Sequence, residues 1–186
     1  MHRLIPFHPL TTSEISSVQA GLVLRNGNLQ IQFVVLGTIA ELLLPQPEGT
    51  AQFRDGLWQT TCLEVFLQSK GERAYEEWNL SPNGNWAYYK FSDYRQLIAE
   101  VTRREPVNLP LFSASEQQLT LTATLPYQVD QGSERDNGFV YGLTAILQLR
   151  SGAKQYWAMR HEADHPDFHQ AASFIGLQKP AQRFRG

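Results

Sequence analysis

The sequence predicts an all-β protein, an antiparallel two-sheet β-sandwich of the immunoglobulin or jelly-roll kind. Three observations carry this prediction. Apolar and polar residues alternate along several short segments, which is the pattern of half-buried strands. Turn-forming pairs such as Asn-Gly and Ser-Gly separate these segments. The connections are short, so neighbouring strands are expected to run antiparallel, and a barrel is the second choice.

The first expected strands form a hairpin. In the segment 29–35, four apolar residues fall on one face and two glutamines on the other. Asn26-Gly27 stands just before this segment, and both residues accept the positive φ that a type I′ turn requires. We therefore expect residues 18–25 to pair with this strand.

Two more strands are expected in the second half of the chain. Leucine and alanine alternate with threonine over 119–125, which places the apolar set on one face only if the segment is extended. The segment 143–149 repeats this arrangement ahead of a Ser151-Gly152 turn.

The middle of the chain predicts three strands, at 62–68, 75–80 and 86–91. Turn residues separate them at Lys70-Gly71 and at Pro82-Asn83-Gly84, and we expect a hairpin turn at Asn83-Gly84. The apolar spacing over 93–104 fits either a short helix or a loop, because Pro106 follows closely.

The three central strands are expected to form one sheet with an aliphatic core face made by Leu63, Val65 and Leu67. Rings beside carboxylate and amide groups on the other face would suit a sugar, although a solvated face with ion pairs explains the same residues. The residues assigned to that other face are Glu64, Glu77, Asn79, Trp86, Tyr88 and Lys90.

Composition narrows the class of protein. A chain of 186 residues without repeats or linkers is expected to form one domain over 1–186. Its net charge of -2 argues against nucleic acid as a partner, and no stretch approaches the roughly 20 apolar residues of a membrane span. Cys62 is the only cysteine, and prolines interrupt residues 1–9 where a signal peptide would be apolar. We therefore expect a cytoplasmic protein.

Three passages resemble DOMON-like ligand-binding domains related to the family 9 carbohydrate-binding modules. The first is Asp55 to Phe66, which reads DGLWQTTCLEVF, and the second is Tyr75 to Trp86, followed by Tyr94-Arg95. The third comprises Tyr156-Trp157, His161, Pro166-Asp167-Phe168-His169 and Phe174. The resemblance implies a DOMON-like sandwich that binds a small molecule, a sugar by analogy, without catalysis.

The resemblance also implies site residues. In the sugar-binding modules, two Trp rings clamp the ligand, and an acidic residue six positions after the first Trp accepts its hydroxyls. Trp58 and Glu64 have that spacing, Trp157 is the candidate second ring, and Asn79 resembles an asparagine on the neighbouring strand. The predicted ligand site is Trp58, Glu64, Asn79 and Trp157, with Tyr88 and Arg160 at the rim.

Two residues allow a different interpretation of this site. Glu77 stands where those modules carry an arginine, which reverses the charge at one wall. Trp58 could instead fill the core, as large aromatic residues usually do. Loss of the ring would then weaken folding instead of binding.

A metal or haem site is the first alternative. His161, His165 and His169 recur every fourth residue with acidic residues among them, but Pro166 interrupts the helix that would align them. Met159 and a histidine could ligate haem in principle, yet the chain has no haem-attachment motif. We predict no metal and no cofactor.

Two further alternatives concern the same sheet face. Glu64 and Glu77 could act as the acid and base of a glycoside hydrolase, but carboxylates on adjacent strands are common, so we predict no catalytic residues. Serine-hydrolase, Walker and dinucleotide motifs are missing from the sequence. A module that binds another protein through an exposed face or edge stays open as well.

Overall fold

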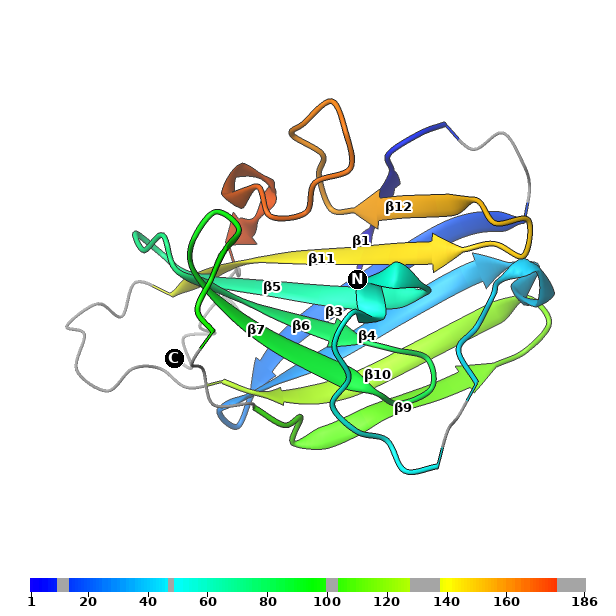
Figure 1. The fold of residues 1–186 in the computed structure, drawn as a ribbon, viewed down its shortest axis with the longest axis horizontal. Helices are drawn as coiled ribbons and strands as arrows, with labels where there is room; N and C mark the ends of the chain where they lie inside the picture. Colours follow the sequence, from blue (N-terminus) through cyan, green and yellow to red (C-terminus); the bar gives the residue numbers. More distant parts are fainter. Residues whose placement is uncertain (10–13, 47–48, 100–103, 128–137, 177–186) are drawn as a thin grey trace, which may run out of the picture.

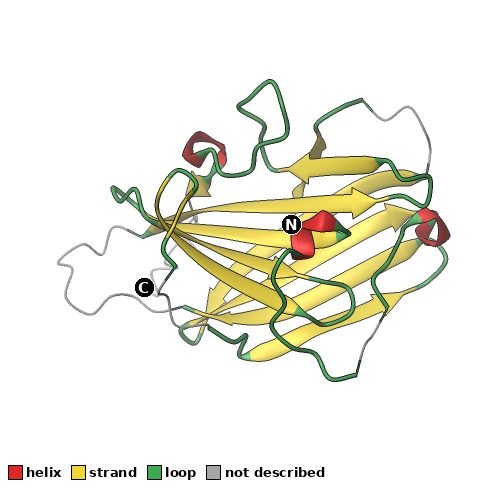
Figure 2. Ribbon diagram, in the orientation of Figure 1, coloured by secondary structure: helices red, strands yellow, loops and turns green. Residues whose placement is uncertain are grey.

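Two antiparallel β-sheets pack face to face in the computed structural model of this chain (Figure 1), which describes residues 1–9, 14–46, 49–99, 104–127 and 138–176. The remaining described structure consists of loops and three single-turn 3-10 helices (Figure 2). The predicted all-β sandwich is therefore confirmed.

The first sheet has five strands in the order β1-β3-β4-β10-β9. Its centre is the expected hairpin, in which Asn26 and Gly27 both have positive φ and Arg25 pairs with Asn28. The alternation of the predicted 119–125 strand also holds. The strands are β1 (His2–Arg3), β3 (Ile15–Arg25), β4 (Asn28–Gly37), β9 (Asn108–Ala114) and β10 (Gln118–Pro126).

The second sheet has eight strands in the order β2-β12-β11-β5-β6-β7-β8, with β13 paired to β11. The expected turns at Gly71, Gly84 and Gly152 all have positive φ. The strands are β2 (Ile5–Pro6), β5 (Cys62–Ser69), β6 (Tyr75–Leu80), β7 (Trp86–Asp93), β8 (Gln96–Leu97), β11 (Phe139–Gln148), β12 (Lys154–Ala158) and β13 (Ile175–Gly176).

The main core lies between the two sheets. Alternate residues of β4 and β10 face alternate residues of β5 and β11 across it, and Leu63 and Val65 belong to it as predicted. Burying such side chains stabilises the fold by roughly 1.5–3 kcal/mol each. The largest side chains in this core include Trp78, Trp157, Phe33, Leu29 and Leu121.

The outer face of the second sheet carries a second apolar cluster. Phe66 of β5, Tyr75 of β6 and Phe91 of β7 pack there against Phe168 and Phe174. The chain after β12 supplies these last two rings and includes the 3-10 helix η3 (Ala171–Ser173). Figure 1 shows this segment, in orange and red, looping out from the end of β12 and continuing to η3. The middle of the sheet is therefore buried on both faces.

The pairing of β6 with β7 corrects one face assignment. Leu80 pairs with Trp86 and Trp78 with Tyr88, so Trp86, Tyr88 and Lys90 lie on the face opposite to Glu77 and Asn79. Five residues connect the two strands, which keeps even-numbered residues opposite even-numbered ones. The predicted grouping of Glu77 and Asn79 with Trp86, Tyr88 and Lys90 is therefore wrong.

The ambiguous segment 93–104 begins as a strand pair. Strand β7 continues to Asp93, a turn follows at Tyr94 and Arg95, and β8 pairs back onto β7. The helix considered there is not observed in the described part of the segment, and residues 100–103 lie outside the described residues. Within the described ranges, no helix is long and apolar enough to span a bilayer.

Candidate functional site

A cavity of about 460 Å³ opens on the outer face of the second sheet. Strands β5 and β6 in the middle of that sheet provide its floor. Flanking strands and loops from three distant parts of the sequence together provide its walls. The lining residues are Asp55, Trp58, Glu64, Glu77, Tyr89, Phe91, Arg95, Leu97, Ile146, Tyr156, Pro166, Phe168 and His169.

The floor carries two buried carboxyl groups, from Glu64 of β5 and Glu77 of β6. Glu64 pairs across the strands with Asn79, and Glu77 pairs with Phe66, so the two glutamates are diagonal neighbours on one face. Thr144 donates its hydroxyl hydrogen to Glu64 at 2.9 Å, and the Asn79 amide donates to Glu77 at 2.6 Å. One oxygen of each carboxyl group is thereby fixed by the protein.

Burial changes the protonation of this pair. Desolvation raises the pKa of Glu64 well above its usual value, and the nearby Glu77 charge raises it further. Desolvation also raises the pKa of Glu77 to about 7, although the hydrogen bond from Asn79 and the charge of Arg95 act in the opposite direction. The pair therefore retains a proton near neutral pH and titrates as one unit.

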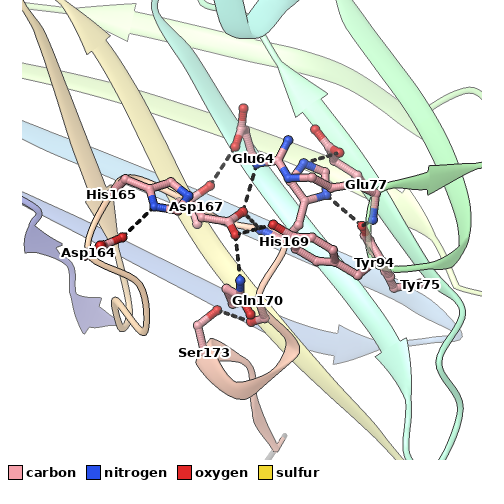
Figure 3. A network of polar contacts seen from close by, with 12 residues as sticks. Glu64, Tyr75, Glu77, Tyr94, Asp164, His165, Asp167, His169, Gln170 and Ser173 are labelled. Atoms are coloured by element: carbon pink, nitrogen blue, oxygen red, sulfur yellow. Dashed lines mark hydrogen bonds and ion pairs between the residues drawn. The ribbon is translucent and has the colours of Figure 1, made fainter.

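Asp167 organises one wall of the cavity, as Figure 3 shows. Its carboxylate accepts hydrogen bonds from the Tyr94 hydroxyl at 2.8 Å, the Arg95 guanidinium at 2.9 Å and the Gln170 amide at 2.8 Å. The backbone N–H of His169 donates to it as well. Burial acts to raise the pKa of Asp167, but these hydrogen bonds outweigh burial and lower it to about 2. Asp167 thus stays ionised and clamps the segment after β12 onto the β7–β8 turn.

His169 enters the cavity from the same segment. Its ring packs edge-on against Phe66 and Phe91, and its Nδ1 lies 2.7 Å from the Tyr75 hydroxyl. Burial lowers the pKa of His169 to about 4, and the Arg95 charge adds to this effect, so the ring is neutral at pH 7. The Tyr75 oxygen accepts the Arg95 backbone N–H, which leaves its own hydrogen to donate to Nδ1. This arrangement favours a hydrogen on Nε2, the nitrogen that faces Glu77.

Trp58 stands on the opposite wall in the 3-10 helix η2 (Leu57–Gln59). Leu57 anchors this helix in a small apolar cluster with Cys62 and Ala87. The Trp58 ring meets the Tyr89 ring edge to face, with centroids 5.6 Å apart. The Tyr89 hydroxyl in turn donates to the Asp55 carboxylate, which ties the loop before η2 to β7. Trp58 is 40% exposed, so its ring does not fill the core.

Known proteins resemble this chain in fold alone. No protein-family model and no curated protein matches it. A solved structure described as a "putative carbohydrate-binding protein" from Bacteroides uniformis ATCC 8492 is similar at 12% identity, with a TM-score of 0.52 over 93% of this chain and 84% of that one. That similarity shows a shared β-sandwich fold.

A second similar structure is a family 9 carbohydrate-binding module from Caldicellulosiruptor kristjanssonii, in complex with glucose. Its identity is 11% and its TM-score 0.42, over 80% of this chain and 69% of that one.

The structure places the predicted site residues in three different settings. Trp58 and Glu64 line the cavity, and Asn79 lies fully buried beside it, where it orients Glu77. Tyr88 and Trp157 face the main core between the sheets, so the predictions that Trp157 lines the concavity and that Tyr88 lies at its rim are wrong.

The reason for both errors is the two-residue period of a strand, which sends adjacent side chains to opposite faces. Of the adjacent pair Tyr156 and Trp157, the tyrosine lines the cavity and the tryptophan faces the core. Arg160 is exposed beyond the end of β12, and its nearest acidic partner is Glu162 at 3.7 Å. It does not line the cavity.

Sequence reasoning missed most of the walls. Tyr89 and Phe91 could have been found by counting the β6–β7 connection, which fixes which residues of β7 share a face with Glu77. Tyr156, Phe168 and Arg95 lie within the passages that carry the family resemblance, but no pattern in the sequence shows that they converge.

The three histidines do not converge. His161 contacts the Ile5 carbonyl, His165 contacts Asp164, and His169 contacts Tyr75. Across the part of the chain that the structure describes, no group of three or more His, Cys, Asp or Glu side chains is placed to hold a metal ion. Met159 packs against the main core.

Proposed function

We propose that this chain binds a small carbohydrate in the cavity on the outer face of the second sheet. The observation that carries the proposal is the joint presence of aromatic walls and buried carboxyl groups around one space of about 460 Å³. A sugar presents apolar C–H faces that stack on rings, and hydroxyls that require directional partners. A cavity of this size is typical of small-molecule sites.

The position of the rings supports a clamp across the floor. Tyr89 lies on β7 and Tyr156 on β12, and the floor strands β5 and β6 lie between β7 and β12 in the sheet. Trp58 adds its ring beside Tyr89, and Phe168 adds one beside Tyr156. A ligand seated on Glu64 and Glu77 would therefore have an aromatic ring at either side.

The carboxyl groups are suited to binding hydroxyls. Each has one oxygen held by the protein, and a carboxylate accepts further hydrogen bonds through its other oxygen. When one carboxyl of the pair is protonated, it can also donate. We propose that these groups recognise the ligand without transforming it.

The family of this chain, its organisation as one unit and its location are also proposals. We propose that the chain belongs with the DOMON-like domains, on the sequence passages from Asp55 to Phe66 and from Tyr75 to Trp86. We also propose a single functional unit over 1–186. A cytoplasmic location stays a prediction that rests on the lone buried thiol of Cys62.

The test is titration calorimetry with a panel of mono- and disaccharides, repeated on Trp58→Ala. Loss of this ring should weaken binding by about 1–3 kcal/mol, as loss of an aromatic anchor typically does, while the melting temperature changes little. Phe112→Ala is the matched control, because Phe112 has a similar exposure of 39% but lies on β9 of the other sheet.

Two outcomes would contradict the proposal. One is that no saccharide of the panel binds at millimolar concentration. The other is that Trp58→Ala and Phe112→Ala have equal effects on affinity, which would place the ligand outside the cavity.

A further inference from the structure

We propose that the cavity prefers a sugar that carries a protonated amino group, and that this group sits between Glu64 and Glu77. The inference rests on the proposed carbohydrate site and names the chemical class of its ligand. It follows from the charges that face the cavity, the free oxygen atoms on its floor and the rings around them.

The charges facing the cavity are mostly acidic. Asp55, Glu64 and Glu77 line it, and Arg95 is the only cationic side chain among the described lining residues. The Arg95 guanidinium is already bound to Asp167 at 2.9 Å, and its side chain is 51% exposed. This cation is therefore bound to Asp167 and half-exposed, and it acts on Glu64 and Glu77 only through its charge.

The floor presents acceptors that lack a donor. Glu64 and Glu77 are only 3% and 5% exposed, and each uses one oxygen for its bond to Thr144 or Asn79. The second oxygen of Glu77 faces Nε2 of His169 at 3.8 Å, which is longer than a hydrogen bond. The second oxygen of Glu64 has no hydrogen-bond partner among the described residues.

A bound cation would stabilise this pair of carboxyl groups. Two buried carboxylates without a cation are costly, because burial removes their water and each repels the other. An ammonium group has three N–H donors and one positive charge, so it can serve both free oxygens at once. Neutral hydroxyls can fill the same space but cannot cancel the charge.

The walls add to this preference. The rings of Trp58, Tyr89 and Phe91 surround the acidic floor. Aromatic faces attract a cation that has lost its water, and this attraction is absent for a neutral ligand. The sugar body would still stack on the same rings, so the two parts of the ligand use one wall.

Release of a proton on binding would be a second, independent sign that an ammonium group occupies the site. Burial raises the pKa of both floor carboxyls, to about 7 for Glu77, so the free site holds a proton near neutral pH. His169 has its pKa lowered by burial to about 4 and stays neutral, and Asp167 stays ionised with Arg95. Asp55, the remaining acid, accepts the Tyr89 hydroxyl. An entering ammonium should therefore displace a proton from the glutamate pair into the buffer.

The experiment compares each amino hexose with its neutral partners on the full chain. Glucosamine, galactosamine and mannosamine are titrated beside the parent hexoses and the N-acetylated forms at a pH of about 7, where the amine is largely protonated. We expect at least one amino hexose to bind about tenfold more tightly than its neutral partners. Repeating the titration in buffers of different ionisation enthalpy should show proton release for the amino sugar alone.

Two substitutions test whether Glu77 causes the preference for amino hexoses. Glu77→Gln keeps the size of the side chain and its acceptor for Asn79 but removes the charge. The ratio of the affinities for the amino hexose and for its neutral partners should therefore fall from about tenfold to near one. Glu76→Gln is the matched control, because Glu76 is the adjacent residue on β6, points to the other face and pairs with Arg104. It should leave the preference unchanged.

The outcomes separate the two levels of the proposal. Equal affinity for amino and neutral hexoses overturns the inference and leaves the carbohydrate site standing. Ethanolamine binding as tightly as an amino hexose overturns the carbohydrate site, since charge alone would then account for the affinity. Binding of neither group overturns both.

Discussion

The two sheets of this sandwich have outer faces of opposite character. On the five-stranded sheet, Gln30 and Gln32 of β4 and Thr122 of β10 face solvent at least in part, as in an ordinary half-buried sheet. On the eight-stranded sheet, Cys62, Glu64 and Phe66 on the outer face of β5 are buried. The inner faces of both sheets share one core.

The difference shows what the additional chain segments do. A half-buried sheet can hold a ligand only by exposed contacts, where water competes for every hydrogen bond. The segment after β12 covers part of the outer face of the eight-stranded sheet and turns it into a second interior. Polar groups on that face then lie in surroundings that strengthen electrostatic interactions and shift pKa values.

The largest expected effect contrasts a buried phenylalanine on the covered outer face of the eight-stranded sheet with a half-exposed one on the edge strand of the other sheet. Phe66 is buried, with its ring stacked on Phe174, whereas Phe112 is 39% exposed on β9. Phe66→Ala should lower the free energy of unfolding by about 3–5 kcal/mol, and Phe112→Ala by less than about 1 kcal/mol. Chemical denaturation of both variants measures this. Equal losses would mean that the segment after β12 does not form a second interior.

An intermediate effect is expected at the clamp of that segment. Asp167→Asn replaces one acceptor oxygen by a donor in a place where four donors converge, so it should cost about 2–3 kcal/mol in unfolding free energy. Asp164→Asn is the control, because Asp164 is exposed three residues earlier and bonds only to His165 within the described contacts. Thermal unfolding at neutral pH compares them, and an equally stable Asp167 variant would argue against the clamp.

The smallest expected effect depends on pH. The carboxyl of Glu77 has a folded-state pKa of about 7 against an ordinary value of 4.5, so the folded protein holds more protons than the unfolded chain between these values. Its contribution to stability therefore falls as pH rises from about 4.5 to about 7.

Glu77→Gln removes this titration. The variant should match the parent near pH 4.5 and become increasingly more stable than the parent as pH rises to about 7. Melting temperatures measured across this range provide the check. A difference that stays constant with pH would show that the carboxyl is not desolvated in the folded protein.

The fold could be predicted because its signals are local. The alternation over 29–35 and the Asn26-Gly27 turn each depend on neighbouring residues, and both were confirmed. Burial of Glu64 on a sheet with two interiors was not predictable from alternation, which assumes that polar residues face water. The run from Cys62 to Leu67 contains only one charged residue. This scarcity of charge is the sequence feature that indicates a strand buried on both faces.

The cavity was only partly predictable because its walls are not local. Trp58 and Glu64, which both line the cavity, were named through a spacing that the family resemblance supplied. That spacing stays meaningful because η2 leads directly into β5. The pairing of Asp167 with Arg95 spans more than seventy residues, and no periodic pattern reports such a contact. Trp157 and Tyr88 were predicted at the site where their neighbours Tyr156 and Tyr89 line the cavity. A shift of one residue along a strand moves a side chain to the other face of the sheet.

Strands build the floor of the cavity and loops build part of its walls, which has a consequence for how its specificity could diversify. Glu64 and Glu77 are fixed by the hydrogen-bonded ladder between β5 and β6, so their spacing is inherited with the fold. Trp58, Arg95 and Phe168 come from separate connections that can change length or sequence while the ladder stays intact. A set of related domains could thus keep one chemical anchor and exchange the shape around it, as antibodies exchange loops on a constant framework.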